Sequence, residues 1–335
     1  MPKPKVLSRF LAYISAAILL LAGLDCRGQG FDVRDEVVRN VFASDRLSEH
    51  VAFLTDTLCA GRGAGTRGAA EAAFWISRRF ESLRLCPFGE YVHSSRAGER
   101  TIHNVLGLSP AADPGAGYVI VAAHYDNLGV LNGRMYPGAD SNASGVAVML
   151  SLANAVRSLS VLGSVGGANV IFAALDAKQL SMAGASALCD EIASGRLTDP
   201  LTGRRIGIKD IKAFVNLDIL GSTLEPVHSG REDYLIMLST DKDLQSTVTR
   251  ANYRSKCYMD VAFDYYGSRD FTDLFLRRIG DQKPFIEAGV PSVLFTSGIT
   301  KHTNKTSDTL DTLDIQVLEK RSRVIFCWLE DLLSR

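Results

Sequence analysis

The sequence lacks any pair of cysteines at the spacing that a zinc site or a redox motif requires. Six cysteines are present in 335 residues, and one of them, Cys26, belongs to the N-terminal segment discussed below. The other five are scattered along the chain, which argues against a cysteine zinc site and against a disulfide framework. The pattern predicts buried cysteines that act as small apolar side chains, and it leaves room for one disulfide in an oxidising compartment.

An excess of charge of either sign is also absent. Lys plus Arg and Asp plus Glu both total 37, so the formal net charge is zero. We therefore expect no binding to nucleic acid or to an anionic membrane through bulk charge. Hydrophobic residues make up 46% of the chain, which is enough for a sizeable core.

Two familiar catalytic patterns are missing. The glycine-rich segment 61–68 does not end in Gly-Lys-Ser/Thr, so it is not a phosphate-binding loop. We expect it to form a turn that packs against the start of the next helix. No Gly-x-Ser-x-Gly elbow is present, so Ser141 and Ser144, although near His124, are not predicted to form a serine triad.

The first 30 residues have the pattern of a secretory signal peptide. Basic residues fall within the first nine positions, an apolar run covers 10–24, and Gly28 and Gly30 precede Phe31. The apolar run is too short for a comfortable membrane span. We expect residues 1–30 to be removed, the mature chain to keep no integral membrane span, and the protein to be periplasmic or extracellular. An uncleaved anchor is the alternative, and Cys26 is a poor lipidation site because Asp25 precedes it.

Short apolar runs and amphipathic stretches alternate along the chain after two helical patterns at 31–60 and 69–83. Such alternation predicts an α/β fold, a three-layer sandwich whose mixed, mostly parallel central sheet has helices on both faces. We expect a single domain over 31–335, with an N-terminal helical part over 31–95 and the sheet core over 100–335. The expected strands cover 105–108, 118–123, 168–175, 213–218, 234–238 and 292–296, and the later helices cover 145–159, 182–193, 241–251, 270–277 and 315–333.

Polar residues gather where the expected strands end. His124, Asp126, Asp176 and Asp218 fall at the carboxyl ends of strands, the edge where ligands bind in parallel sheets. Zinc binds imidazole nitrogen and carboxylate oxygen, and His124 and Asp126 point the same way, which suits a ligand and a residue that orients it. For His124 alone we favour an ordinary core role. Together with Asp140 in the next polar loop, the set favours a present or former metal site.

Several segments of the chain resemble the co-catalytic zinc aminopeptidases of metallopeptidase family twenty-eight. The resemblance runs from about Leu47 to the C-terminus, and glutaminyl cyclases, glutamate carboxypeptidase and the transferrin receptor are similar to the same fold. It implies a zinc exopeptidase fold, a pair of zinc ions and aminopeptidase activity. The segments that carry it are Leu58–Gly68, Asn104–Val105, His124–Asp126, Gly138–Gly145 and Asn216–Asp218.

One zinc of the family is held by a motif His, a bridging Asp and a later Asp. The resemblance assigns the His to His124 and the later Asp to Asp218. The bridging Asp is the second acid of a Gly-Ala-Asp-Asp-Asn segment, and that position is Ser141 in this chain. Asp140 matches only the first acid, so it is a candidate substitute ligand if it turns toward the metal.

The second zinc of the family needs the same bridge, the second Glu of an Asp-x-Glu-Glu segment, and a late His. Here the segment continues from Asp176 with Lys178 at the general-base position and Gln179 at the ligand position. Asn304 stands at the position of the late His. His302, two residues away, is the other candidate substitute ligand.

These replacements affect both metal binding and chemistry. Hydrolysis needs a group that takes a proton from metal-bound water, whereas a lysine is protonated at neutral pH unless it is strongly desolvated. We therefore expect Lys178 to repel a metal ion and to balance Asp126, Asp140 or Asp218 as a fixed positive charge. At most one zinc per chain is expected, and none is the alternative. The segment Asp281–Phe285 resembles a Ser-Asp-His-x-x-Phe segment of the family, again without its His.

Two hypotheses about function follow. The first is a secreted zinc-aminopeptidase-like protein with little or no peptidase activity, retained for binding a peptide or a protein. The second is an active metallo-exopeptidase that removes N-terminal residues with one zinc or an unconventional base. The first predicts no turnover, and the second predicts hydrolysis that a chelator abolishes. Cyclase chemistry is not expected, because it would require the same missing acids and histidine.

Overall fold

The computed structural model describes residues 32–163, 165–223 and 233–334. The expected signal peptide over 1–30 lies outside the described residues, so its removal stays a prediction. Two compact units divide between Glu36 and Val37. Helix α2 (Val33–Val41) begins in the first unit, and the strands and the later helices belong to the second unit, Val37–Arg335.

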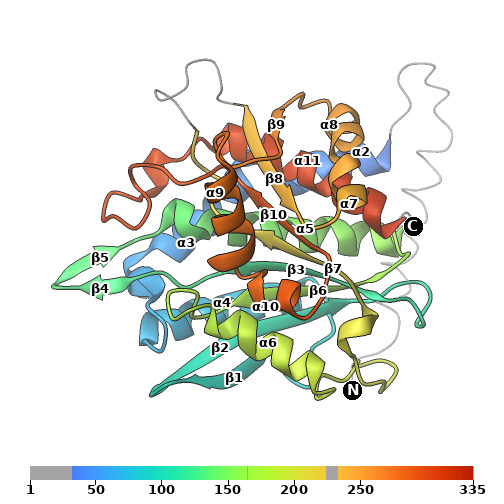
Figure 1. Cartoon of the computed structure of the whole chain (residues 1–335), viewed down its shortest axis with the longest axis horizontal. Coiled ribbons are helices and arrows are strands. Elements are labelled where there is room, and N and C mark those ends of the chain that lie inside the picture. Colours follow the sequence, from blue (N-terminus) through green and yellow to red (C-terminus); the bar gives the residue numbers. More distant parts are fainter. Residues whose placement is uncertain (1–31, 164, 224–232, 335) are drawn as a thin grey trace, which may run out of the picture. The chain divides into compact units, whose positions relative to one another are not determined.

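A sheet of eight strands forms the centre of the second unit (Figure 1), in the order β1-β2-β6-β3-β7-β10-β8-β9. The inner strands β6, β3, β7 and β10 run parallel, β8 and β9 run parallel to each other, and the remaining neighbours are antiparallel. The strands are β1 (Val92–Ala97), β2 (Arg100–Ser109), β3 (Tyr118–His124), β6 (Asn169–Leu175), β7 (Ile211–Leu217), β8 (Tyr234–Ser239), β9 (Asp260–Ala262) and β10 (Ser292–Thr296).

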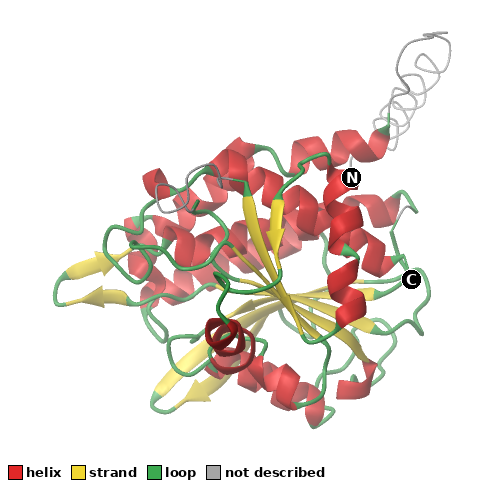
Figure 2. Ribbon diagram, turned by 45° about the horizontal axis from the view of Figure 1, so that its top comes forward, coloured by secondary structure: helices red, strands yellow, loops and turns green. Residues whose placement is uncertain are grey.

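Helices cover both faces of this sheet (Figure 2), so the expected three-layer, mixed α/β architecture is confirmed. The buried cores on the two faces include side chains of α3, α4, α5 and α11 on one side and of α6 and α10 on the other. The helices are α3 (Ser44–Thr55), α4 (Arg67–Ser82), α5 (Gly145–Val161), α6 (Ala183–Ala193), α7 (Lys242–Ser246), α8 (Val248–Ser255), α9 (Arg269–Asp273), α10 (Lys283–Glu287) and α11 (Ile315–Leu333).

Strand β3 shows why the sheet is buried on both faces. Val119 and Val121 belong to one core, whereas Ile120 and Ala122 belong to the other, because successive side chains of a strand point to opposite faces. All seven residues of β3 are buried, as expected for a parallel strand between two helical layers. Burial of one valine or isoleucine contributes about 1.5–3 kcal/mol, so these continuous apolar runs fix the position of the strand.

The structure differs from the sequence predictions at weakly patterned segments. Strand β1 begins within the N-terminal part expected to be helical up to residue 95, and β9 was not expected. The hairpin of β4 (Gly129–Leu131) and β5 (Arg134–Tyr136) was also missed. The helix expected over 241–251 is divided into α7 and α8 at Thr247. These strands are short or exposed at alternate positions, and lack the apolar runs that reveal β3 and β6.

One helix of the described residues, Ala139–Val161, is long and apolar enough to cross a membrane by length and composition. In the structure, 72% of its apolar window is buried, and its α5 part belongs to the core against β3. The apolar character of this segment is therefore explained by its place in the core. The five described cysteines are free, and Cys59, Cys189 and Cys327 are buried as expected.

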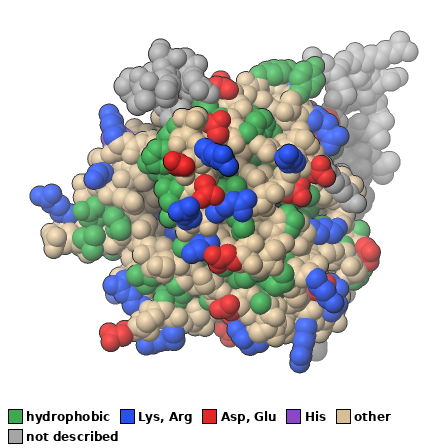
Figure 3. Space-filling view, in the orientation of Figure 1, with side chains coloured by type: hydrophobic (Ala, Val, Ile, Leu, Met, Phe, Trp, Pro, Cys, Tyr) green, Lys and Arg blue, Asp and Glu red, His purple; other side chains and the backbone are tan. Residues whose placement is uncertain are grey.

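The face seen in Figure 3 carries basic and acidic side chains next to one another, with neither sign forming a continuous patch. Exposed ion pairs occur among the described residues, such as Arg278 with Asp273, whose Nε and Oδ2 atoms are 3.0 Å apart. Such exposed pairs contribute little to stability. The mixture on this face agrees with the zero formal net charge.

Candidate functional site

The candidate site is the carboxyl edge of three adjacent parallel strands. Strand β3 ends at His124, β6 is followed by Asp176, and β7 is followed by Asp218. His124 is in register with the last residue of β6, so the three strand ends meet at the same edge. His124 and Asp218 are in direct contact across this edge.

Both ring nitrogens of the buried His124 face oxygen atoms. Its Nε2 lies 3.2 Å from Oδ1 of Asp218, and its Nδ1 lies 3.1 Å from the carbonyl oxygen of Asp126 and 3.4 Å from Oδ1 of Asp126. Burial and the Lys178 ammonium oppose protonation, but Asp218 and Asp126 outweigh them and raise the pKa of His124 to about 9. This raised pKa favours a ring that is protonated on both nitrogens at neutral pH and can donate to both partners.

Lys178 places its ammonium on the same carboxylate. Its Nζ forms an ion pair with Oδ2 of Asp218, and 18% of the Lys178 side chain is exposed against 9% for Asp218. Burial would lower the pKa of Lys178, but the negative charges of Asp218, Asp281 and Asp126 outweigh it and raise that pKa. Conversely, burial would raise the pKa of Asp218, but Lys178 and His124 hold it well below its usual range. The pair is therefore fully ionised at neutral pH.

Asp126 fixes the segment that carries Lys178. Its two carboxylate oxygens accept the backbone N–H groups of Lys178 and Gln179, at 2.9 and 3.2 Å. The preceding Asp176 accepts the backbone N–H of His103 at 2.9 Å, and burial followed by the Asp126 charge raises the pKa of Asp176 to about 6. Asp126 thus contacts His124 and also positions the ammonium, a role broader than the orienting one expected from the sequence.

Asp140 is turned away from His124. Its Oδ1 accepts the backbone N–H of Gly221 at 2.7 Å and the hydroxyl of Ser144 at 3.2 Å. Burial raises the pKa of Asp140, and the hydrogen bonds from its neutral neighbours act in the opposite direction. In this arrangement Asp140 supports the loop after Asp218. It does not act as a substitute for the bridging Asp, whose position in this chain is occupied by Ser141.

The remaining sequence-predicted positions do not join the cluster. Gln179 and Asn304 are exposed, and Ser141 is buried. The backbone N–H of Ser141 donates to Oδ2 of Asp308 at 3.1 Å. His302 is hydrogen-bonded through Nδ1 to the hydroxyl of Ser307 at 3.0 Å, so it does not act as a substitute ligand in this conformation.

Three residues that shape the site were not assigned a role from the sequence. Asn142 donates to the carbonyl oxygens of His124 and Leu217, at 3.2 and 2.9 Å, and thereby ties the ends of β3 and β7 together. Asp308 accepts the backbone N–H of Asp140 at 2.8 Å as well as that of Ser141. Asn142 lies in the Gly138–Gly145 segment that carries the resemblance, and Asp308 lies four residues after Asn304, the position of the late His. These places in the sequence were the only available signal.

The third residue, Asp281, is fully buried, and neither of its carboxylate oxygens has a hydrogen-bond partner among the described residues. The side-chain oxygen of Asn216 is also buried without a hydrogen-bond partner among the described residues. Burial raises the pKa of Asp281 to about 6, although the charges of His124 and Lys178 oppose that rise. The site therefore holds one carboxylate whose negative charge is supported only at a distance.

As arranged, these residues do not fit a zinc ion. A catalytic zinc normally has three protein ligands and an open position for water. Over the described ranges, no group of three or more His, Cys, Asp and Glu side chains is placed to hold a metal. The pair of His124 and Asp218 has the right atom types, but the ammonium of Lys178 already contacts Asp218.

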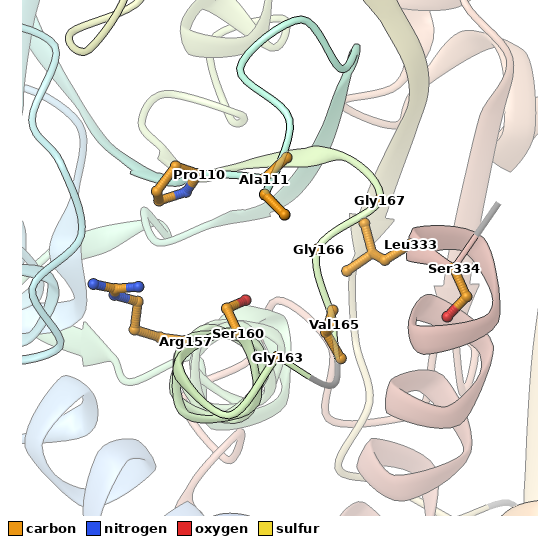
Figure 4. A pocket seen from close by; sticks show the side chains of 11 residues that line it. Pro110, Ala111, Arg157, Ser160, Gly163, Val165, Gly166, Gly167, Leu333 and Ser334 are labelled. Carbon is orange, nitrogen blue, oxygen red and sulfur yellow. The ribbon is translucent and has the colours of Figure 1, made fainter.

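A separate cavity of about 540 Å³ lies at the opposite end of the sheet (Figure 4). It is lined by Ala111, which follows β2, and by Gly167, which precedes β6, so it adjoins the amino-terminal end of the parallel strands. Arg157 and Ser160 of α5 line one side of it and Leu333 of α11 lines the other (Figure 4). This cavity includes none of the residues of the candidate site.

Comparisons with known proteins agree with this architecture. The model of peptidase family M28 matches residues 104–329. LapB from Legionella pneumophila is 19% identical with a TM-score of 0.69, over 92% of this chain and 77% of that chain. BSAP, a zinc aminopeptidase from Bacillus subtilis, is 15% identical with a TM-score of 0.63, over 87% and 96%. A glutaminyl cyclase from an Acidobacteriales bacterium is 17% identical with a TM-score of 0.63, over 93% and 100%.

The structural likeness at these identities concerns the fold, whereas the family match covers most of the chain, including His124 and Asp218. The resemblance stated from the motifs is thereby confirmed at the level of the family. The chain belongs to peptidase family M28.

Proposed function

We propose that this protein binds a peptide or a protein at the carboxyl edge of its sheet and hydrolyses it slowly or not at all. The observation that carries the proposal is the pairing of two donors of the metal-binding type, His124 and Asp218, with no third one placed to share a metal with them among the described residues. A fold without its metal ligands can still recognise a ligand, since fold and chemistry are separable.

The chemistry at the general-base position supports the same proposal. Removal of a proton from water requires an unprotonated group, but Lys178 is held in its ammonium form by the carboxylate of Asp218. Its neighbour Gln179 is exposed and neutral. The side chains at these two positions therefore supply charge and polarity to a bound ligand, and neither supplies a base.

Exposed apolar side chains beside the edge support binding. Tyr266, Phe271 and Ile299 are 37%, 47% and 39% exposed, and we call them the aromatic rim. Tyr266 donates its hydroxyl hydrogen to the carbonyl oxygen of Ile299 at 2.8 Å, and the buried Tyr265 accepts the N–H of the same residue at 2.7 Å. Asp218 lies close enough for its charge to raise the pKa of Tyr265, after burial and Tyr266. Aromatic side chains of this kind are enriched at binding surfaces.

The alternative is an active metallo-exopeptidase that removes N-terminal residues. It is favoured by the zinc aminopeptidase among the structural relatives and by the closeness of His124 to Asp218. This function would require a metal to displace Lys178 and a further ligand, for which Asp140 or His302 would have to turn.

The test is metal content, turnover and binding on the same preparation of the full chain. Zinc per chain is measured after purification, and hydrolysis of a panel of aminoacyl chromogenic substrates is followed with added zinc and with a chelator. Binding of a peptide library is measured in parallel, with Tyr266→Ala and Phe271→Ala as variants of the aromatic rim. We expect no chelator-sensitive turnover, and weaker peptide binding in the rim variants. Zinc-dependent turnover that His124→Ala or Asp218→Ala abolishes would establish the alternative.

A fourfold variant serves as the positive control. Ser141→Asp, Lys178→Glu, Gln179→Glu and Asn304→His together restore the side chains of the family at the replaced positions. We expect this variant to bind zinc to a larger extent than the parent chain, because the changes at Ser141, Gln179 and Asn304 restore three ligand side chains and the change at Lys178 removes the ammonium that contacts Asp218. If the folded variant binds no more zinc than the parent, the assigned register of these four positions is wrong.

We also propose that the protein is exported. The support is the pattern of residues 1–30, which combines a basic start, an apolar run and small residues before Phe31. Fractionation of the native cells and N-terminal sequencing of the recovered protein test this proposal. A mature N-terminus at or near Phe31 supports it, and a protein that keeps Met1 in the cytoplasm refutes it.

A further inference from the structure

Three buried carboxylates act on Lys178. Asp218 contacts it directly, Asp281 is close enough for its charge to act on it, and Asp126 holds the backbone of the same residue in place. All three are buried, and Asp281 has no hydrogen-bond partner of its own in the described part of the chain. Buried carboxylates without a compensating charge are strongly unfavourable, so a cation at this point is required for the fold.

A lysine can supply the positive charge that these carboxylates require, in place of a metal ion. Its ammonium is a compact point charge with three donors on a flexible stem. The stem is covalently attached, so no loss of translational freedom accompanies the placement of the charge, unlike the binding of a free ion. The backbone N–H groups of Lys178 and Gln179 are fixed on Asp126, which limits the region that the ammonium can reach.

The same contacts would exclude a divalent cation. His124 Nε2 and Asp218 Oδ1 are 3.2 Å apart, and two atoms bound to one tetrahedral zinc at ~2.1 Å stand about 3.4 Å apart. The two side chains are thus nearly at the separation that a shared metal would need. The Lys178 ammonium contacts the other oxygen of Asp218, so a metal between His124 and Asp218 would meet a positive charge at close range.

We infer that Lys178 is a tethered counter-ion, which stabilises the carboxyl edge without a metal and keeps divalent cations out of it. The inference concerns stability and metal affinity. It makes no use of the peptide-binding proposal, and its test contains neither a peptide nor a substrate. The failure of one is therefore distinguishable from the failure of the other.

The test compares Lys178→Met with the wild-type full chain in thermal unfolding, after dialysis against a chelator and then with zinc chloride added. We expect the wild-type Tm to be the same under both conditions. Lys178→Met should lose roughly 5–10 °C in Tm, because buried carboxylates remain without their cation. Added zinc should restore part of that loss, and Lys178→Met should retain zinc through gel filtration whereas the wild type should not.

Two controls separate the charge from the side chain. Lys178→Arg keeps the positive charge, so its Tm should stay nearer to the wild type and should not respond to zinc. Lys209→Met removes an exposed lysine, and we expect its Tm to match that of the wild type with or without zinc.

The inference is overturned if the wild-type Tm falls on chelation, if the wild type retains zinc, or if Lys178→Met matches the wild type and ignores zinc. Should Lys178→Met fail to fold, the double variant Lys178→Met with Asp218→Asn decides the matter. Removal of both charges of the pair should recover folding and abolish any response to zinc. A double variant that is also unfolded contradicts a role for Lys178 as a counter-ion.

Discussion

Asp218 and Asp140 lie at the same edge of the sheet, and their surroundings shift their pKa values in opposite directions. Asp218 contacts two cationic side chains, His124 and Lys178, which hold its pKa below the usual range against the effect of burial. Asp140 accepts hydrogen bonds from the N–H of Gly221 and the hydroxyl of Ser144, and burial leaves its pKa raised. One carboxylate is compensated by charge, and the other mainly by neutral donors.

The difference separates two kinds of residue that look alike in the sequence. The pKa of Asp218 is shifted by the charges of Lys178 and His124, and carboxylates with pKa values shifted in this way are typical of binding or catalytic centres. The environment of Asp140 is that of a carboxylate that organises a loop, through Gly221 on one side and its own backbone bond to Asp308 on the other. The same substitution at the two positions should therefore have unequal effects.

The largest effect is expected from Asp218→Asn. This nearly isosteric change removes the negative charge that the Lys178 ammonium contacts. A buried ion pair that loses one partner costs about 3–5 kcal/mol, and the amide oxygen of Asn retains one acceptor, so we expect the free energy of unfolding to fall by about 3 kcal/mol. Urea unfolding at neutral pH measures this loss.

The matched control is Asp273→Asn, on an exposed helix. Asp273 pairs with Arg277 and Arg278, and its side chain is 42% exposed. The solvent screens both ion pairs, so Asp273→Asn should change the free energy of unfolding by about 0–1 kcal/mol. Equal losses of unfolding free energy in Asp218→Asn and Asp273→Asn would show that the buried ion pair of Lys178 with Asp218 stabilises the fold no more than an exposed pair does.

A third carboxylate, Asp281, sharpens the comparison because it lacks a direct partner in the described ranges. Its pKa is raised to about 6, chiefly by burial, so it binds a proton more tightly in the folded state than in the unfolded state. Its contribution to stability is therefore present below about pH 4 and is lost as the pH rises to about 6. Asp218, with its lowered pKa, acts in the opposite sense and loses its contribution only in acid.

The corresponding prediction is for Asp281→Asn, unfolded by urea from pH 4 to pH 7. Relative to the wild type, the variant should gain about 2–3 kcal/mol over this range, because the cost of ionising a buried carboxyl is removed. Asp314→Asn, at the N-cap of α11, where the side chain accepts the backbone N–H of Val317, provides a carboxylate control outside the Lys178 ion pair. A difference between Asp281→Asn and the wild type that does not change with pH would contradict a buried, poorly compensated carboxyl.

Most of the sheet could be predicted because its inner strands are continuous apolar runs ended by polar residues. The positions of His124 and Asp218 at one edge follow from that pattern alone. The orientation of Asp140 could not be predicted, because it depends on the N–H of Gly221, 81 positions away along the chain. The missing partner of Asp281 is likewise a property of the packed interior, and the sequence offers only its place in a family-like segment.

A smaller effect is expected from Asp140→Asn. The amide oxygen can still accept the N–H of Gly221 and the hydroxyl of Ser144, so only the charge and one acceptor site change. We expect the free energy of unfolding to fall by about 1 kcal/mol, a third of the loss at Asp218. Urea unfolding of both Asn variants in one experiment makes the comparison. A larger loss at Asp140 than at Asp218 would mean that the loop, and not the ion pair, dominates the stability of this edge.

The smallest effect is expected from Gln179→Glu, which restores a metal-ligand side chain of the family at an exposed position. Its backbone N–H bond to Asp126 is retained, so the free energy of unfolding should change by about 0.5 kcal/mol or less. The single change should not confer zinc binding, because Lys178 still contacts Asp218 and a third ligand is still lacking among the described residues. Isothermal titration calorimetry with zinc measures the zinc affinity of this variant directly. Tight zinc binding by Gln179→Glu would mean that exposed residues at this edge can reorganise around a metal despite the ammonium, and it would weaken the distinction between Asp218 and Asp140.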